Sequence, residues 1–80
     1  MKLPRDIDAV DLIRALHVLG YAKVRQTGSH IRIKTTRDGD YSETIPCHSP
    51  IKVGTLNAIL GNIAQHHHLT KDALLQLLKL

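Results

Sequence analysis

The stretch YAKVRQTGSHIRIK, residues 21–34, contains two runs of alternating apolar and polar side chains, one on each side of a glycine. Alternation with a period of two is typical of β-strands that bury one face and expose the other. Thr27 and Gly28 lie between the runs, and glycine readily adopts the positive φ that a tight two-residue turn requires. The stretch therefore predicts a β-hairpin.

A two-residue turn at Thr27-Gly28 fixes which residues of the hairpin face each other. Two apolar pairs would face the core: Val24 with Ile31, and Ala22 with Ile33. The other face would carry Arg25 opposite His30, Lys23 opposite Arg32, and Tyr21 opposite Lys34. Cations that face each other repel, and neither strand contains an acidic residue that would offset this repulsion. The pattern favours a face that binds an anion, although lysines on a merely soluble sheet face also deter aggregation.

A third strand is predicted at residues 43–48, ETIPCH, where Pro46 indicates an edge position. A bulged loop at residues 38–40 would place Ile45 opposite Ile33 and Cys47, buried, opposite Ile31. The same register brings His48 beside His30, and a slip by two residues would keep the same faces.

Three amphipathic helices are predicted around these strands. Residues 8–20 should begin with Asp8 as N-cap and end at Gly20. Residues 52–65 should begin near Lys52, Gly54 and Thr55, where free amides favour a phosphate, although the pattern by itself favours simple capping of the helix by Thr55. Residues 69–80 should be capped by Thr70. The side chains expected in the core are Ala9, Leu12, Ile13, Leu16, Leu19, Leu56, Ile59, Leu60, Ile63, Leu74, Leu77 and Leu78, whereas His17 should be solvated.

The predicted order is one helix, a three-stranded antiparallel meander and two further helices. Such a chain folds as an α+β two-layer sandwich, with helices covering one face of the sheet. The open face would then carry the cations and histidines of the strands: Arg25, His30, Arg32, Lys34 and His48.

Length and composition narrow the class of function. Eighty residues predict one domain, 1–80, with a thin aliphatic core that argues against a cofactor enzyme. Eleven Lys and Arg against seven Asp and Glu favour an anionic partner, nucleic acid first. One cysteine, no apolar run long enough for a bilayer, and the start MKLPRDID without a signal-peptide core predict a cytoplasmic protein with no membrane partner.

The histidines suggest two kinds of chemistry. Cleavage of RNA needs no cofactor, because the 2′-hydroxyl is the nucleophile and the protein only moves protons and stabilises phosphate charge. His30 could move protons while Arg25 and Arg32 bind phosphate oxygens and Ser29 donates a hydrogen bond. The run His66-His67-His68 lacks the spacing of a structural zinc site, so we expect a solvated loop and no metal.

Three motifs give the chain a family resemblance. They are Gly28-Ser29-His30, Pro46 followed two places later by His48, and Gly54-Thr55-Leu56 at the start of a helix. In the same order and spacing, from Asp8 to Leu78, the chain resembles the HicA toxins of HicA–HicB toxin–antitoxin pairs.

The resemblance implies a fold like that of double-stranded-RNA-binding domains, α-β-β-β-α, here with an additional C-terminal helix. It also implies a ribosome-independent mRNA endonuclease, or mRNA interferase, with His30 as the catalytic residue. A HicB-type antitoxin would cover the His30 face. The residues expected to bind RNA are Lys23, Arg25, Ser29, Arg32, Lys34 and Lys52, with Gly28 and His48 as accessory positions. The alternative is a catalytically silent RNA-binding module, in which the same cations only hold phosphate.

Overall fold

The computed structural model describes residues 3–80. Met1 and Lys2, which open the segment compared above with a signal peptide, lie outside the described residues. The elements are α1 (Ala9–Leu16), a 3₁₀ turn η1 (His17–Leu19), β1 (Ala22–Thr27), β2 (His30–Thr35), β3 (Tyr41–Pro46), α2 (Val53–His66) and α3 (Lys71–Leu78).

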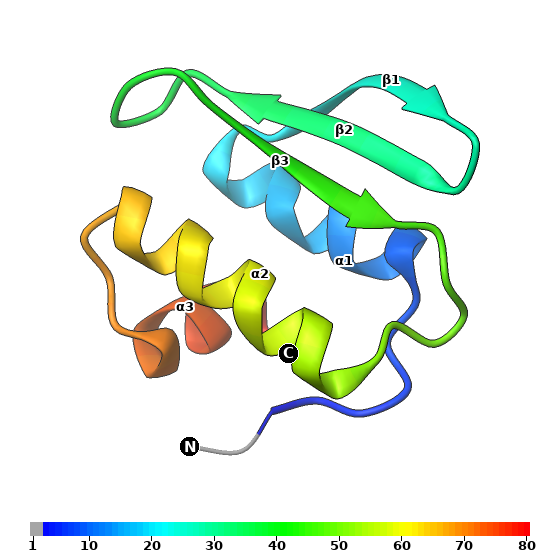
Figure 1. Cartoon of the computed structure of the whole chain (residues 1–80). Coiled ribbons are helices and arrows are strands. Elements are labelled where there is room, and N and C mark those ends of the chain that lie inside the picture. The colour runs from blue at the N-terminus through cyan, green and yellow to red at the C-terminus, as the bar shows by residue number, and fades with distance from the viewer. Residues whose placement is uncertain (1–2) are drawn as a thin grey trace.

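The three strands form one layer and the helices form the other, as Figure 1 shows. The sheet is antiparallel with the order β1-β2-β3, so β2 is central and β3 is an edge strand. The predicted α+β sandwich with an additional C-terminal helix is therefore confirmed. Among the described residues, no helix is long and apolar enough to span a bilayer.

The β1–β2 hairpin differs from the predicted register. Gly28 and Ser29 form the turn, with Gly28 at φ +57°, and Thr27 rather than Arg25 pairs with His30. An irregularity between Lys23 and Arg25 shifts the pairing again. A bulge of this kind leaves the extra residue unpaired and bends the strand.

This shift overturns predicted positions in β1 and at Tyr21 just before it. Val24 is 58% exposed and Ala22 is exposed, so neither packs in the core. Tyr21, expected opposite Lys34 on the open face, is 1% exposed and Ala22 takes that pairing instead. Tyr21 is part of the buried core cluster, whereas the two smaller side chains are not.

The β2–β3 pairing has the predicted faces but slips by two residues. Ile45 pairs with Ile31, and Thr44 pairs with Arg32, because the connecting loop contains residues 36–40 rather than 38–40 alone. Ile45 is fully buried as expected. Cys47 was expected to be buried but is exposed, because β3 ends at Pro46 and Cys47 follows it.

The helices bury the faces that their periodicity predicts, with few exceptions. Leu77 is 41% exposed and Leu75 is buried in its place. The Asp8 side chain does not cap α1 but accepts a hydrogen bond from Ser49 Oγ at 2.7 Å. Thr70 does cap α3, since its Oγ1 accepts from the Ala73 amide at 3.0 Å. Gly20 ends the first helical segment at φ +81°.

The histidine run is not the solvated loop that the sequence predicted. His66 is the last residue of α2 and stacks on the Tyr41 ring at 4.7 Å between centroids. His67 is buried, with Nδ1 2.8 Å from an Asp38 carboxylate oxygen and Nε2 3.0 Å from the Tyr21 hydroxyl. His68 is exposed at φ +57°. The run therefore joins the end of α2 to the β2–β3 loop.

The pKa values of Asp38 and Tyr21 in this network are shifted in the directions that its geometry predicts. The hydrogen bond from His67 lowers the pKa of Asp38, against a smaller opposing effect of burial. Burial raises the pKa of Tyr21 well above its usual range, and the nearby Tyr41 and Glu43 add to that effect. A carboxylate acceptor indicates that His67 carries a proton on Nδ1 and accepts the tyrosine O–H at Nε2.

Candidate functional site

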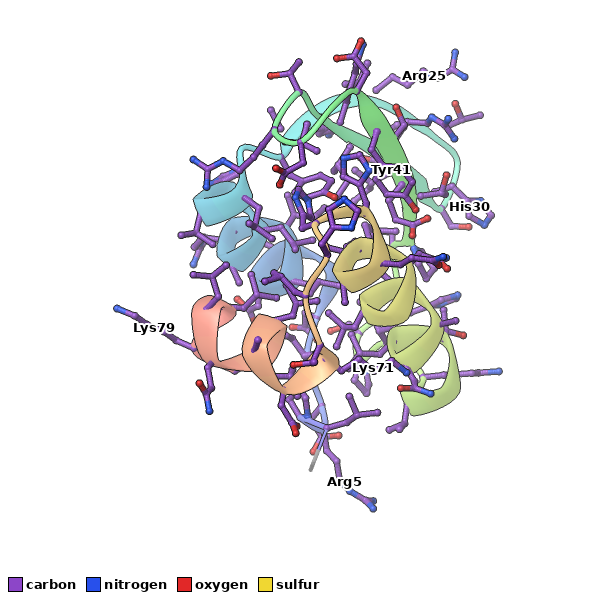
Figure 2. All side chains as sticks on the ribbon, turned by 90° about the vertical axis from the view of Figure 1, so that its left-hand side faces the viewer. Arg5, Arg25, His30, Tyr41, Lys71 and Lys79 are labelled. Atoms are coloured by element: carbon purple, nitrogen blue, oxygen red, sulfur yellow. The ribbon has the colours of Figure 1, made fainter. Side chains whose placement is uncertain are left out.

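The open face of the sheet is built by the alternation along β2. Ile31, Ile33 and Thr35 are buried, whereas the residues between them are exposed. His30, Arg32 and Lys34 therefore project away from the helices, as the sequence predicted. Figure 2 shows the side chains of His30 and Arg25 at the edge of the molecule, pointing into the solvent.

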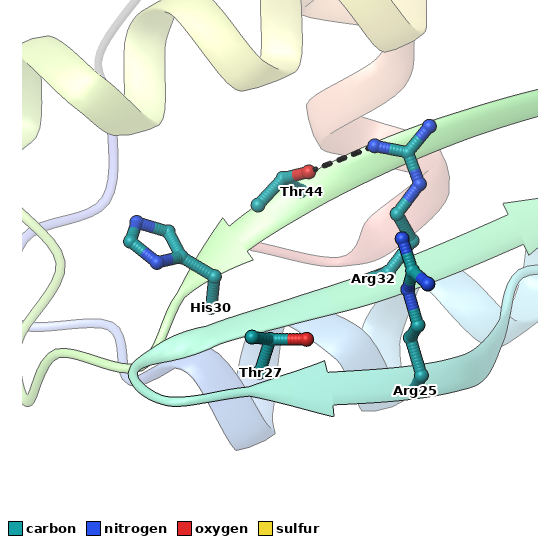
Figure 3. A pocket seen from close by; sticks show the side chains of 5 residues that line it. All are labelled: Arg25, Thr27, His30, Arg32 and Thr44. Atoms are coloured by element: carbon teal, nitrogen blue, oxygen red, sulfur yellow. Dashed lines mark hydrogen bonds between the residues drawn. The ribbon is translucent and has the colours of Figure 1, made fainter.

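Two arginines face each other on this surface. Arg25 of β1 and Arg32 of β2 are direct cross-strand partners. They line a shallow pocket of about 270 Å³ with Thr27, His30 and Thr44, and none of these five residues is acidic. Arg32 Nη1 donates a hydrogen bond to Thr44 Oγ1 at 3.2 Å, as Figure 3 shows. The pocket presents two guanidinium groups and two hydroxyl groups, which are suitable partners for phosphate oxygens.

A second pocket adjoins the first and shares His30 and Thr44 with it. It has a volume of about 380 Å³ and is also lined by Pro46, His48, Lys52 and Thr55. The structure thus brings His48 to the same cavity as His30, although the predicted pairing of the two was wrong, because Pro46 is the strand partner of His30. His30 lies between a pocket with two arginines and a pocket with a lysine.

The start of α2 forms one wall of the second pocket. Lys52 occupies the N-cap position, and no side chain caps the helix. The expectation that Thr55 caps the helix was wrong, because Thr55 lies within its first turn and is exposed. The first amides of the helix, with no carbonyl partner in the helix, add positive character to this wall.

Some predicted RNA-binding residues lie elsewhere. Lys23 pairs with Ile33 and so lies on the helix side of the sheet, where its Nζ donates to Gln26 Oε1 at 3.1 Å. Lys34 lies on the open face but is 3.8 Å from an Asp40 carboxylate oxygen, in an exposed ion pair. Neither lysine lines the two pockets beside His30.

The predicted Gly28 and Ser29 form the tight turn next to His30. The Ser29 carbonyl accepts a hydrogen bond from the Cys47 amide at 2.6 Å, which joins this turn to the end of β3. Thr27 and Thr44 were missed by the sequence analysis. Only the strand register could have identified them, because it places Thr27 beside His30 and Thr44 beside Arg32.

Residues 3–80 contain no group of three or more His, Cys, Asp or Glu side chains placed to hold a metal ion. His66 and His67 instead use ring nitrogens in hydrogen bonds, His66 to the Arg37 and Gly39 carbonyls at 3.1 Å each.

The arrangement at His30 can bind an anion and move a proton at the same place. The imidazole is exposed and so is accessible to a large substrate. Both pockets are open, which suits a polymer that lies across the surface better than a small molecule that must be enclosed.

Comparison with known proteins gives one match. The family model described as "HicA toxin of bacterial toxin-antitoxin" matches residues 9–67, from the start of α1 through the end of α2, which is more than half of the chain. No match was found among curated proteins or among solved structures. The third helix lies outside the matched region.

Proposed function

Because this chain belongs to the family of HicA toxins of bacterial toxin–antitoxin systems, we propose that it is an endoribonuclease that cuts mRNA without the ribosome. Inhibition of translation through loss of mRNA would then be the basis of toxicity. The family implies an antitoxin partner. We further propose that this partner is of the HicB type, covers the His30 face, and acts with the toxin in the cytoplasm.

One observation carries the proposal: an exposed histidine lies between two cationic pockets on an open sheet face. Arg25 and Arg32 line one pocket, Lys52 lines the other, and His30 lines both. Cationic side chains without neighbouring acids favour a polyanion. The exposed imidazole supports a role in proton transfer in addition to the binding of phosphate.

In the proposed reaction, the RNA supplies its own nucleophile. The 2′-hydroxyl attacks the adjacent phosphorus, and His30 serves as a general acid/base in the transfer of protons. The negative charge that develops on the phosphate oxygens is stabilised by Arg25 and Arg32, whose guanidinium groups can each engage two oxygens. Thr44 holds the Arg32 guanidinium through the 3.2 Å hydrogen bond.

The proposal is tested by inducing wild-type protein and His30→Ala in cells. Growth and the integrity of total mRNA are measured, and folding is checked by circular dichroism. His17→Ala is the matched control, since His17 is also exposed but lies on η1 and lines neither pocket.

We expect the wild type and His17→Ala to arrest growth with fragmented mRNA, and His30→Ala to do neither. If folded wild-type protein binds RNA but leaves mRNA intact, the proposal is wrong and the chain is a silent RNA-binding module. If His30→Ala fragments mRNA as the wild type does, the chemistry resides elsewhere.

A further inference from the structure

We propose that His48 is a second proton-transfer residue, which protonates the leaving 5′ oxygen during RNA cleavage. The inference rests on the proposed ribonuclease function. It assigns a residue to the second proton transfer, which His30 alone would not provide. Cleavage through the 2′-hydroxyl needs one proton removed and one proton supplied on opposite sides of the phosphorus. Two histidines around one phosphate would meet this requirement.

The backbone holds His48 close to the His30 turn. Pro46, two residues before His48, is the cross-strand partner of His30. The next residue, Cys47, donates its amide to the Ser29 carbonyl at 2.6 Å, and the His48 amide donates to the Pro46 carbonyl at 2.9 Å. These contacts hold the segment that carries His48 against the turn that carries His30.

Both imidazoles line the same cavity. The 380 Å³ pocket is bounded by His30 on the β2 side and by His48, Lys52 and Thr55 on the α2 side. In Figure 3 the His30 ring points away from Arg25 and Arg32. Because His30 lines both pockets, the geometry favours a reacting phosphate at their junction, with the two arginines on one side of it and His48 on the other.

The chemistry balances with these groups alone. The 2′ oxygen forms a bond to phosphorus as its proton passes to a ring nitrogen of His30. The bond between phosphorus and the 5′ oxygen breaks, and His48, which enters the step as the imidazolium ion, gives this oxygen a proton and becomes neutral. The products are a 2′,3′-cyclic phosphate and a 5′-hydroxyl. Lys52, in the same pocket, would offset the charge on the non-bridging oxygens.

The test uses the purified full-length chain and an RNA oligonucleotide built around a bond that the wild type cuts. A second oligonucleotide replaces the bridging 5′ oxygen at that bond with sulfur. A thiolate leaves without needing a proton, so only this substrate bypasses a missing general acid. Wild type, His48→Ala, His30→Ala and the matched control His17→Ala are compared on both, with RNA binding and circular dichroism measured in parallel.

We expect His48→Ala to fold, to bind RNA and to cut the ordinary oligonucleotide at least about 100-fold more slowly than the wild type. It should cut the sulfur-substituted oligonucleotide at close to the wild-type rate. His30→Ala should be slow on both, and His17→Ala should match the wild type on both.

Three results would overturn the assignment of His48. They are a wild-type rate on the ordinary oligonucleotide, an equal loss on both substrates, and rescue by sulfur of His30→Ala in place of His48→Ala. The proposed function fails separately, if the wild type cuts neither oligonucleotide nor mRNA.

Discussion

Replacing Tyr21 with Phe removes one hydroxyl group from the core and tests the buried polar network. That hydroxyl lies 3.0 Å from His67 Nε2, and Tyr21 and His67 are 1% and 7% exposed. The ring and its packing remain in the variant. The imidazole nitrogen, however, loses its partner in a place that water does not readily reach.

The magnitude follows from that loss. A buried acceptor left without a hydrogen bond costs about 1–3 kcal/mol. In a chain of this size, each kcal/mol lowers the melting temperature by about 4–8 °C. We therefore expect Tyr21→Phe to melt at least about 4 °C below the wild type.

The assay is thermal and urea unfolding followed by far-ultraviolet circular dichroism, with Tyr41→Phe as the matched control. The Tyr41 hydroxyl donates to Glu43 Oε1 at 3.3 Å on a half-buried side chain. Its removal leaves an acceptor that water can reach, so the control should lose less than about 1 kcal/mol. Equal melting temperatures for the two variants would refute the reasoning, since burial of the acceptor is what separates them.

Three further predictions concern separate features of the fold and the site. The hydrogen bond from His67 lowers the pKa of Asp38, so its stabilising effect is present above the ordinary carboxyl pKa and is lost as the pH falls below about 4. Asp38→Asn should therefore lower the melting temperature at pH 7 and flatten its decline in acid, whereas parallel curves would contradict this. Gly20→Ala should cost about 1–2 kcal/mol in urea unfolding, because φ is +81° and the added Cβ would lie 3.0 Å from a threonine oxygen; a neutral result would refute that strain. Arg25→Gln and Arg32→Gln should each lower the salt dependence of binding to single-stranded RNA by about 0.7 in the log–log slope, with Lys23→Gln, on the helix side of the sheet, unchanged; an equal effect of all three would contradict the placement of Lys23.

The helices and the faces of β2 and β3 were predictable because they depend on local periodicity. A spacing of three and four residues places Leu56, Ile59, Leu60 and Ile63 on one side of α2 whatever lies opposite. Likewise, if the isoleucines of β2 face inward, the alternation along the strand requires His30, Arg32 and Lys34 to face outward. The register between strands could slip by two without changing these faces.

The register of β1 was not predictable from the same pattern. Gly28 satisfies a tight turn at Thr27-Gly28 or at Gly28-Ser29, and the sequence contains no feature that decides between them. The bulge before Arg25 then reverses the faces of the residues that precede it. Lys23 is consequently on the helix side, although it is two residues from Arg25 and regular alternation would place both on the same face.

The polar network had no local signature at all. Asp38 and His67 are 29 residues apart, and Tyr21 is 46 residues from His67. A run of three histidines is compatible with a solvated loop. Only the tertiary structure shows that His67 has a buried hydroxyl and a carboxylate as hydrogen-bond partners. For the site, His30 and the arginines could be identified from sequence, whereas Thr27 and Thr44 required the true pairing of the strands.

The most direct test of the central claim is cleavage of an mRNA transcript by purified protein without ribosomes, comparing wild type with His30→Ala under single-turnover conditions. RNA binding by both proteins is measured on the same transcript. The account predicts that the variant binds as the wild type does but cuts at least about 100-fold more slowly. A folded His30→Ala protein that cuts the transcript at the wild-type rate would contradict it.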